Sequence, residues 1–345
     1  MIFSTARLHE PARELLSGFG LVEHDADDAT LAKCDVLFTL PHRVTPDLMR
    51  RMPNLRAIQS YSAGVDGLDY AAVPKNVRIY SNSGGFTRPV AEQAWSLVLS
   101  LAKGANVRRK RVLPRLLRGK TLVVLGCGAI GSEVARIGRE AFSMKTVGVS
   151  VTFTVPEAFD ERRDPGSLAG AVAKADVIVD ALPLNKDTVS ILDYKVLKRM
   201  KAEAILVNVG RGETVDREGV TRLLRERPET RFGTDVFWRT GGKEDFETPL
   251  WDMENFAGTF HSAVFGRDDA LAEAEVMAAE NIRRFLTIGD AMNRVDRGEY
   301  AGVGLYETTS SPTHSLNNPR GERGVLGHSH AQKEVRHRRT RRADE

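Results

Sequence analysis

The sequence predicts an α/β protein of two domains, each built on a parallel sheet. Short β-rich segments alternate with helical segments over residues 1–302, a pattern typical of parallel α/β sheets. The chain of 345 residues is longer than one hydrophobic core usually organises. A long helical pattern, which begins near Thr87 and runs towards Val107, separates two series of β-rich segments and is interpreted as a connector.

The first series lies within the first hundred residues. Helical segments are expected at residues 11–17 and 45–52, and the stretch SAGVDGLD at residues 62–69 is rich in turn formers. The β-rich segments begin near Ile2, Asp35, Leu55 and Val77.

The second series follows a basic stretch at residues 108–120. Its β-rich segments are KTLVVLG, KTVGVS, ADVIVDALP, AILVNVG, RFGTDVF and FAGTFH. An amphipathic helix over residues 268–286 then has room to return the chain to the first domain. We therefore expect one domain of residues 1–95 plus 285–302, an inserted domain of residues 96–284, and a disordered tail of residues 303–345, which lacks an apolar period.

Composition excludes several classes of protein. With 41% hydrophobic and 28% charged residues, the chain has the composition of a soluble globular protein. The net charge of +4 is small for this length, so no nucleic-acid partner is expected. Neither a signal peptide nor an apolar run of membrane-spanning length is found, and the only cysteines, Cys34 and Cys127, fit a reducing compartment. We expect a cytoplasmic protein with no membrane role and no metal site.

A glycine pattern marks the start of the second domain. Gly126, Gly128 and Gly131 form GCGAIG directly after the apolar stretch TLVVL and before a helical stretch, with Ala129 and Ile130 between them. The first glycine permits a tight turn, the second lets the backbone approach a diphosphate, and the third lets helix and strand pack closely. Anions are favoured at the helix N-terminus that follows. The pattern predicts a Rossmann domain that binds a dinucleotide.

The next strand leaves the choice of dinucleotide open between NAD and NADP. The acidic residue that usually holds the ribose 2′-hydroxyl is missing at its end, where Ser150 or a neighbour stands. No Arg or Lys follows until Arg162 and Arg163, which are equally well explained as solvated charges. Cys127, within the glycine loop, is interpreted as a small filler rather than a redox switch.

With this pattern in place, the chain resembles the D-isomer-specific 2-hydroxyacid dehydrogenases, a family that includes glyoxylate and hydroxypyruvate reductases, phosphoglycerate dehydrogenase and formate dehydrogenase. The resemblance covers about residues 1–302 and implies a Rossmann NAD(P)-binding domain inserted in a flavodoxin-like substrate domain. Its carriers, in order, are SAGVDGLD, NSGG with VAEQA, LVVLGCGAIG, ALPLNKDT, VNVGRGETVD, TDVF, PLW and FHSA.

By this resemblance, Arg211 grips the carboxylate and carbonyl of the substrate. A planar guanidinium suits that bidentate task better than an ammonium does. Arg211 follows the predicted strand AILVNV, whose end lies at the carboxyl edge of the sheet. The alternative is a surface arginine paired with Glu213 or Asp216.

The resemblance assigns the proton transfer to His261 of FHSA, a residue type that both accepts and returns a proton near neutral pH. The family also uses a glutamate that orients this histidine, five residues after the aspartate of the D-V-F motif, and Thr240 stands there. Glu244 or Glu247 is the substitute that the following loop offers, and we select Glu244 as the third catalytic residue.

Further contacts follow from the same resemblance. Asp235 is expected to contact the nicotinamide amide, and Pro183 belongs to the cofactor-binding set; the alternative for Asp235 is a cap at a strand end. The turn of Ser62, Ala63 and Gly64 is expected to hold the substrate carboxylate through backbone N–H groups, although an ordinary turn uses the same residues.

The resemblance implies an NAD(P)-dependent oxidoreductase that interconverts a small 2-keto acid and its D-2-hydroxy acid, and that forms a homodimer. A rival interpretation is a catalytically weak, NAD(H)-sensing interaction protein of the corepressor type. A third gives weight to the basic tracts at residues 108–111 and 336–342 as contacts with nucleic acid, but neither tract is interleaved with aromatic residues. The presence of both Arg211 and His261 favours the enzyme.

Overall fold

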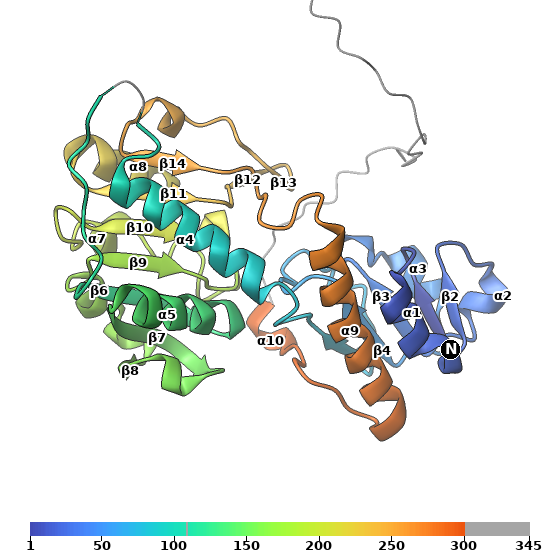
Figure 1. The fold of residues 1–345 in the computed structure, drawn as a ribbon. Helices are drawn as coiled ribbons and strands as arrows, with labels where there is room; N and C mark the ends of the chain where they lie inside the picture. The colour runs from blue at the N-terminus through green and yellow to red at the C-terminus, as the bar shows by residue number, and fades with distance from the viewer. Residues whose placement is uncertain (108–109, 301–345) are drawn as a thin grey trace, which may run out of the picture. The chain divides into compact units, whose positions relative to one another are not determined.

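The computed structural model describes residues 1–107 and 110–300 (Figure 1). The predicted disordered tail and the tract at residues 336–342 lie outside these residues, as do Arg108 and Arg109 of the first tract. Within the described residues, no helix is long and apolar enough to cross a membrane. The short 3₁₀ turns are Ser17–Phe19, Pro41–Arg43, Pro156–Ala158, Pro165–Ser167, Gly212–Thr214 and Pro249–Asp252.

Five parallel strands form the first sheet, in the order β2-β1-β3-β4-β5. This is the strand order of flavodoxin-like domains. Alternate residues of the strands enter two separate apolar cores, because successive side chains point to opposite faces: Leu37 and Ile58 join one core, and Phe38 and Ala57 the other. The strands are β1 (Ile2–Ser4), β2 (Leu21–Glu23), β3 (Val36–Thr39), β4 (Ala57–Ser60) and β5 (Arg78–Tyr80).

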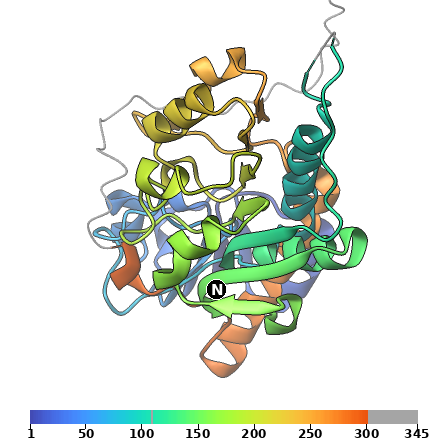
Figure 2. The same ribbon diagram turned by 90° about the vertical axis from the view of Figure 1, so that its left-hand side faces the viewer.

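Seven parallel strands form the second sheet, in the order β14-β11-β10-β9-β6-β7-β8. Counted from β6, the order reads 3-2-1-4-5-6 with β14 added, which is the Rossmann arrangement. Figure 2 shows β6, β7 and β8 side by side. The strands are β6 (Thr121–Cys127), β7 (Lys145–Phe153), β8 (Glu161–Arg163), β9 (Val177–Asp180), β10 (Ile205–Asn208), β11 (Arg231–Thr234) and β14 (Phe256–Gly258).

Helices cover the faces of both sheets. Helix α4 packs on β10 and β11 of the second sheet, whereas α9 packs on α1 and β4 of the first (Figure 1). The chain therefore leaves the first sheet, builds the second and returns, as expected of an inserted Rossmann domain. The helices are α1 (Glu10–Leu16), α2 (Asp28–Leu31), α3 (Pro46–Arg51), α4 (Thr87–Lys103), α5 (Ala129–Phe142), α6 (Leu168–Val172), α7 (Tyr194–Leu197), α8 (Arg217–Glu226), α9 (Asp268–Ile288) and α10 (Arg297–Tyr300).

The predicted fold class is confirmed: two parallel α/β sheets, one flavodoxin-like and one Rossmann. The domain boundaries at residues 95, 96, 284 and 285 stay a prediction. The connector helix ends at Lys103, earlier than expected, because Gly104 takes a left-handed φ of 71° and caps it. Among the described strands, those without a counterpart in the sequence prediction are β2, β8, and a hairpin of β12 (Arg239–Thr240) and β13 (Lys243–Glu244).

Candidate active site

The turn that carries Arg211 follows β10 and is held by buried polar groups. The Asn208 side chain donates to the carbonyl of Arg211 at 2.8 Å and accepts from the backbone N–H of Gly210 at 2.9 Å. The hydroxyl of Thr214 lies 2.7 Å from the same Arg211 carbonyl. Arg211 is thus fixed at the carboxyl edge of the second sheet, where ligands bind in folds of this kind.

Behind this turn lies Asp180, a fully buried carboxyl group at the end of β9. Burial raises its pKa to about 6, against hydrogen bonds from Thr214 and the backbone of Leu182. The Thr214 hydroxyl carries one proton but lies 2.6 Å from Asp180 and 2.7 Å from the Arg211 carbonyl. The hydroxyl therefore donates to one of these two oxygens at a time, and its bond to Asp180 is the one that works against the raised pKa.

The guanidinium of Arg211 reaches a turn of the first sheet's domain. Its Nε donates to Asp66 Oδ1 at 3.0 Å, and Nη1 donates to the Gly210 carbonyl at 2.7 Å. Nη2 lies against Gly64, where a Cβ atom would stand only 1.5 Å from it. The partner of Arg211 is therefore Asp66 rather than Glu213 or Asp216, and the group facing Gly64 is directed at the predicted substrate-binding turn.

That turn follows β4 and comprises Ser62, Ala63 and Gly64. The Ser62 hydroxyl donates to the Gly64 carbonyl at 2.7 Å, and the Ser62 N–H donates to the Ser60 hydroxyl at 3.0 Å. Ala63 lies between them, half-buried. The structure thus brings the predicted substrate turn and the predicted substrate arginine together.

His261 follows β14 and is joined to a carboxylate. Its Nδ1 lies 2.7 Å from Glu244 Oε2, while Glu244 Oε1 accepts from the backbone N–H of Phe237 at 2.9 Å. Burial raises the pKa of Glu244, but the hydrogen bond and the charge of His261 outweigh it and the net shift is downward. An ionised carboxylate only accepts, so Nδ1 carries the proton of this hydrogen bond and Nε2 is the ring nitrogen left for proton exchange.

The hairpin β12–β13 brings Glu244 to this position. Its turn is Gly241-Gly242, with left-handed φ values of 58° and 79°, which glycine adopts readily. Because of the hairpin, a carboxylate reaches His261 from Glu244, four residues after Thr240, the position at which the sequence pattern of the family has its glutamate. The alternative, Glu247, is exposed, and its carbonyl accepts from Arg217 at 2.7 Å.

Asp235 is buried at the end of β11 and holds the turn of His261. Its Oδ1 accepts from the Thr259 hydroxyl at 2.6 Å and from the Ser262 N–H at 2.9 Å, while its carbonyl accepts from the His261 N–H at 2.7 Å. The backbone of His261 takes a left-handed φ of 48°, unusual outside glycine, which these bonds maintain. The observed bonds are those of the cap that sequence analysis left as the alternative for Asp235.

The glycine loop between β6 and α5 has the geometry of a diphosphate cradle. Gly126 has a φ of 83°, and a Cβ at Gly131 would stand 2.0 Å from the Gly126 carbonyl, so both positions require glycine. Gly128 is exposed, and a Cβ there would meet nothing within 4 Å. The space in front of Gly128 and the N-terminus of α5, which begins with Ala129 and Ile130, therefore fits an anionic dinucleotide.

The remaining predicted cofactor residues belong to the two strands that pair with β6 or to the loop after one of them. Ser150 lies at the end of the buried part of β7, and Pro183 is exposed in the loop after β9. Arg162 and Arg163 lie on β8, the strand next to β7, and Arg163 pairs with Glu161. Cys127 is buried, and burial raises the pKa of its thiol to about 12. The thiol is therefore neutral, which agrees with its interpretation as a small filler.

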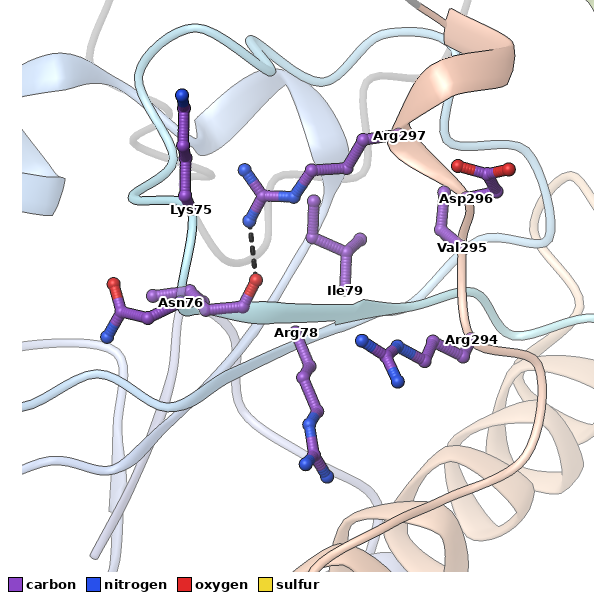
Figure 3. A pocket seen from close by; sticks show the side chains of 9 residues that line it. Lys75, Asn76, Arg78, Ile79, Arg294, Val295, Asp296 and Arg297 are labelled. Atoms are coloured by element: carbon purple, nitrogen blue, oxygen red, sulfur yellow. Dashed lines mark hydrogen bonds between the residues drawn. The ribbon is translucent and has the colours of Figure 1, made fainter.

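A hollow of about 600 Å³ lies at the start of β5, and none of the predicted site residues lines it (Figure 3). It is lined by several cationic side chains, but Arg297 donates to the carbonyls of Val73, Pro74 and Val77, and Arg78 donates to that of Gly289. These guanidinium groups hold chain segments together. In the described part of the chain, no three His, Cys, Asp or Glu side chains gather as metal ligands.

Two residues of the site were missed by sequence analysis. Asp66 belongs to the stretch SAGVDGLD, where an acidic residue flanked by turn formers was the available signal. Arg239 lies in the segment between the D-V-F motif and PLW, and it donates to Asp66 Oδ2 at 2.8 Å. No sequence signal marked Arg239, because its role depends on a hairpin that brings distant residues together.

Comparison with known proteins agrees with this geometry. Residues 86–263 match the family model described as the NAD-binding domain of D-isomer-specific 2-hydroxyacid dehydrogenases. The glyoxylate reductase of Aeropyrum pernix is 30% identical over 312 residues, covering 82% of this chain and 92% of that protein.

Solved structures show the same fold. A D-isomer-specific 2-hydroxyacid dehydrogenase family protein from Aeromonas salmonicida has a TM-score of 0.70 and 26% identity, covering 86% of this chain and 98% of that one. The enzyme of this kind from Xanthobacter autotrophicus, solved with NADPH, has a TM-score of 0.72 and 22% identity, covering 87% and 99%. The resemblance read from the sequence is confirmed.

Proposed function

This chain belongs to the D-isomer-specific 2-hydroxyacid dehydrogenase family, and we propose that it reduces a short 2-keto acid, glyoxylate or hydroxypyruvate, to the 2-hydroxy acid. NAD(P)-dependent interconversion of a 2-keto acid and its 2-hydroxy acid is the reaction that the family carries out. The name of the relative from Aeropyrum pernix, glyoxylate reductase, supports the choice of a small substrate.

The observation that carries the proposal is the pairing of His261 with Glu244 at 2.7 Å, at the same edge of the second sheet as Arg211. Arg211 binds the substrate carboxylate and keto oxygen from its position against Gly64, and the positive charge stabilises the developing alkoxide. His261 donates a proton from Nε2 to that oxygen, and Glu244 holds the protonated ring in place. A binding module does not require this combination of groups.

NADH or NADPH, when bound at the glycine loop, supplies the hydride that C2 of the substrate receives. Gly128 would let the backbone approach the diphosphate, and Ser150 and Pro183 would hold the rest of the dinucleotide. Asp235 keeps the turn of His261 in place through Thr259 and Ser262. Closure of the two domains excludes water from the substrate.

The test is a spectrophotometric screen of short 2-keto acids with NADH and NADPH in parallel, followed by Arg211→Ala and His261→Ala. We expect Arg211→Ala to abolish turnover while the variant still binds cofactor. His261→Ala is expected to lower kcat by roughly two to four orders of magnitude, the usual range for a positioned acid or base. An unchanged rate in either variant removes that residue from the mechanism.

The homodimer, the cytoplasmic location and the absence of a nucleic-acid partner stay predictions of the sequence and belong to this proposal. Gel filtration with light scattering tests the first. A monomer at working concentration would contradict it.

A further inference from the structure

Arg239, at the start of the hairpin, binds two carboxylates that come from different parts of the chain. Its Nη1 donates to Asp66 Oδ2 at 2.8 Å, and its Nε donates to Glu213 Oε1 at 2.6 Å. Nη2 donates to the other oxygen of Glu213 at 3.2 Å. Asp66 is buried, with an exposed fraction of 5%, and the side chains of Arg239 and Glu213 are mostly covered, at 12% and 16%, so solvent screens this pairing little.

Asp66 divides its two oxygens between two arginines. Oδ1 accepts from Arg211 Nε at 3.0 Å, and Oδ2 accepts from Arg239 Nη1 at 2.8 Å. Burial raises the pKa of Asp66, but the charges of Arg211 and Arg239 outweigh it and lower the pKa overall. The ionised carboxylate comes from the turn after β4, whereas both arginines follow strands of the second sheet, so this contact also joins the two domains.

The β12–β13 hairpin also connects Arg239 to Glu244, the partner of His261. Arg239 and Glu244 stand directly opposite each other on β12 and β13, and cross-strand partners project to the same face of a hairpin. Arg239 therefore reaches Asp66 and, through it, Arg211, while Glu244 reaches His261. A continuous chain of polar contacts and one strand pair thus links the substrate arginine to the proton donor.

We propose that Arg239 is a positioning residue, which sets the spacing between Arg211 and His261 through Asp66 on one side and its strand partner Glu244 on the other. The inference rests on the proposed function. Arg239 itself is neutralised by Glu213 and Asp66, so it acts through Arg211 and not on the substrate. A guanidinium is required because only a planar fork holds Glu213 and Asp66 at the same time.

The experiment compares Arg239→Lys and Arg239→Gln with the wild type in the full chain. It measures kcat and KM for the best 2-keto acid from the screen, dissociation constants for the reduced cofactor, and thermal unfolding. Lysine keeps the charge but lacks the planar fork, and glutamine lacks both. We expect both variants to lose about tenfold or more in kcat, since misplacement of a catalytic group by about 1 Å can cost about a hundredfold in rate. Cofactor affinity should stay within about twofold, because the glycine loop is untouched.

Arg217→Gln is the matched control. Arg217 pairs with Asp245, just after the hairpin, at 3.2 Å, with exposed fractions of 28% and 27%, and it does not contact Asp66 or Glu213. Its kcat should stay within about twofold of the wild type. Asp66→Asn, alone and with Arg239→Gln, completes a double-mutant cycle, and the double variant should lose less than the product of the single losses, because both act on Arg211.

The outcomes separate the two proposals. A wild type that turns over no 2-keto acid with either cofactor overturns the proposed function. An active wild type with unchanged kcat in Arg239→Lys overturns only the positioning role, because charge alone then suffices. A variant that melts earlier but keeps the wild-type kcat below its melting temperature also overturns it, since Arg239 is then a structural ion pair alone.

Discussion

Gly64→Ala tests the geometry of the site most directly. The added Cβ would stand 1.5 Å from Nη2 and 2.6 Å from Cζ of Arg211, whereas ordinary van der Waals contact begins near 3.4 Å. The backbone of Gly64 is outside the left-handed region, so alanine is tolerated by the main chain and the guanidinium must move instead.

The size of the effect follows from that displacement. Restoring ordinary contact moves Nη2 by about 2 Å, and misplacement by about 1 Å is enough to cost about a hundredfold in rate. We therefore expect kcat/KM to fall by at least about a hundredfold, equivalent to about 2.7 kcal/mol of transition-state stabilisation. Cofactor affinity should not change, because Gly64 follows β4 of the first sheet whereas the glycine loop follows β6 of the second.

The assay is steady-state reduction of the preferred 2-keto acid, with cofactor binding measured separately by fluorescence. Gly170→Ala is the control, because a Cβ there would meet nothing within 4 Å and Gly170 is exposed on α6, a helix to which none of the predicted site residues belongs. If Gly64→Ala keeps kcat/KM within about threefold of the wild type while Arg211→Ala is inactive, then Arg211 does not act from its position against Gly64, and the reasoning fails.

Three further predictions concern buried or constrained groups. Asp180→Asn should raise the free energy of unfolding at high pH. The folded pKa of Asp180, about 6, exceeds the ordinary 3.8, so the stability that the protonated carboxyl contributes is complete below pH 3.8 and is lost as pH rises through about 6, by about 3 kcal/mol in all. Urea unfolding of the variant and the wild type at about pH 4 and about pH 8 checks this, and an equal difference in unfolding free energy at both pH values contradicts it. Gly131→Ala should lower the melting temperature because its Cβ would stand 2.0 Å from a carbonyl, whereas Gly128→Ala should keep it and weaken cofactor binding; equal melting temperatures argue against this loop geometry. Glu244→Gln should lower kcat for keto reduction about tenfold or more, because the protonated ring of His261 loses its counter-charge; an unchanged kcat contradicts a role of Glu244 in the reaction.

Local patterns in the sequence are enough to predict most of the fold. The strand that ends at Cys127 and the helix that begins at Ala129 flank three glycines, and this combination identifies a Rossmann unit without knowledge of its neighbours. The sequence does not predict strands β2 and β8, because each has only three residues at the edge of its sheet, too few to show the alternation of apolar and polar residues typical of a strand.

The site was predictable only where a motif fixes the position. Arg211 and His261 stand at strand ends within recognisable motifs, and the structure places them at one edge of the second sheet. Glu244 is one of two candidates that the sequence offers, and its proximity to His261 depends on the Gly241-Gly242 turn, which pairs residues across a hairpin. The contact of Asp66 with Arg211 joins residues far apart in sequence, so it follows from the tertiary fold alone.

The return of the chain to the first sheet has a consequence for protein handling. Strand β5 is the last strand of that sheet, and its outer edge is covered by the segment after α9: the N–H of Val295 donates to Ile79, the N–H of Ser81 donates to Asn293, and Tyr80 bridges to Arg294. A shortened protein that stops before Asn293 would leave the hydrogen-bonding groups of β5 open as a template for another chain, and unprotected edges of this kind promote aggregation.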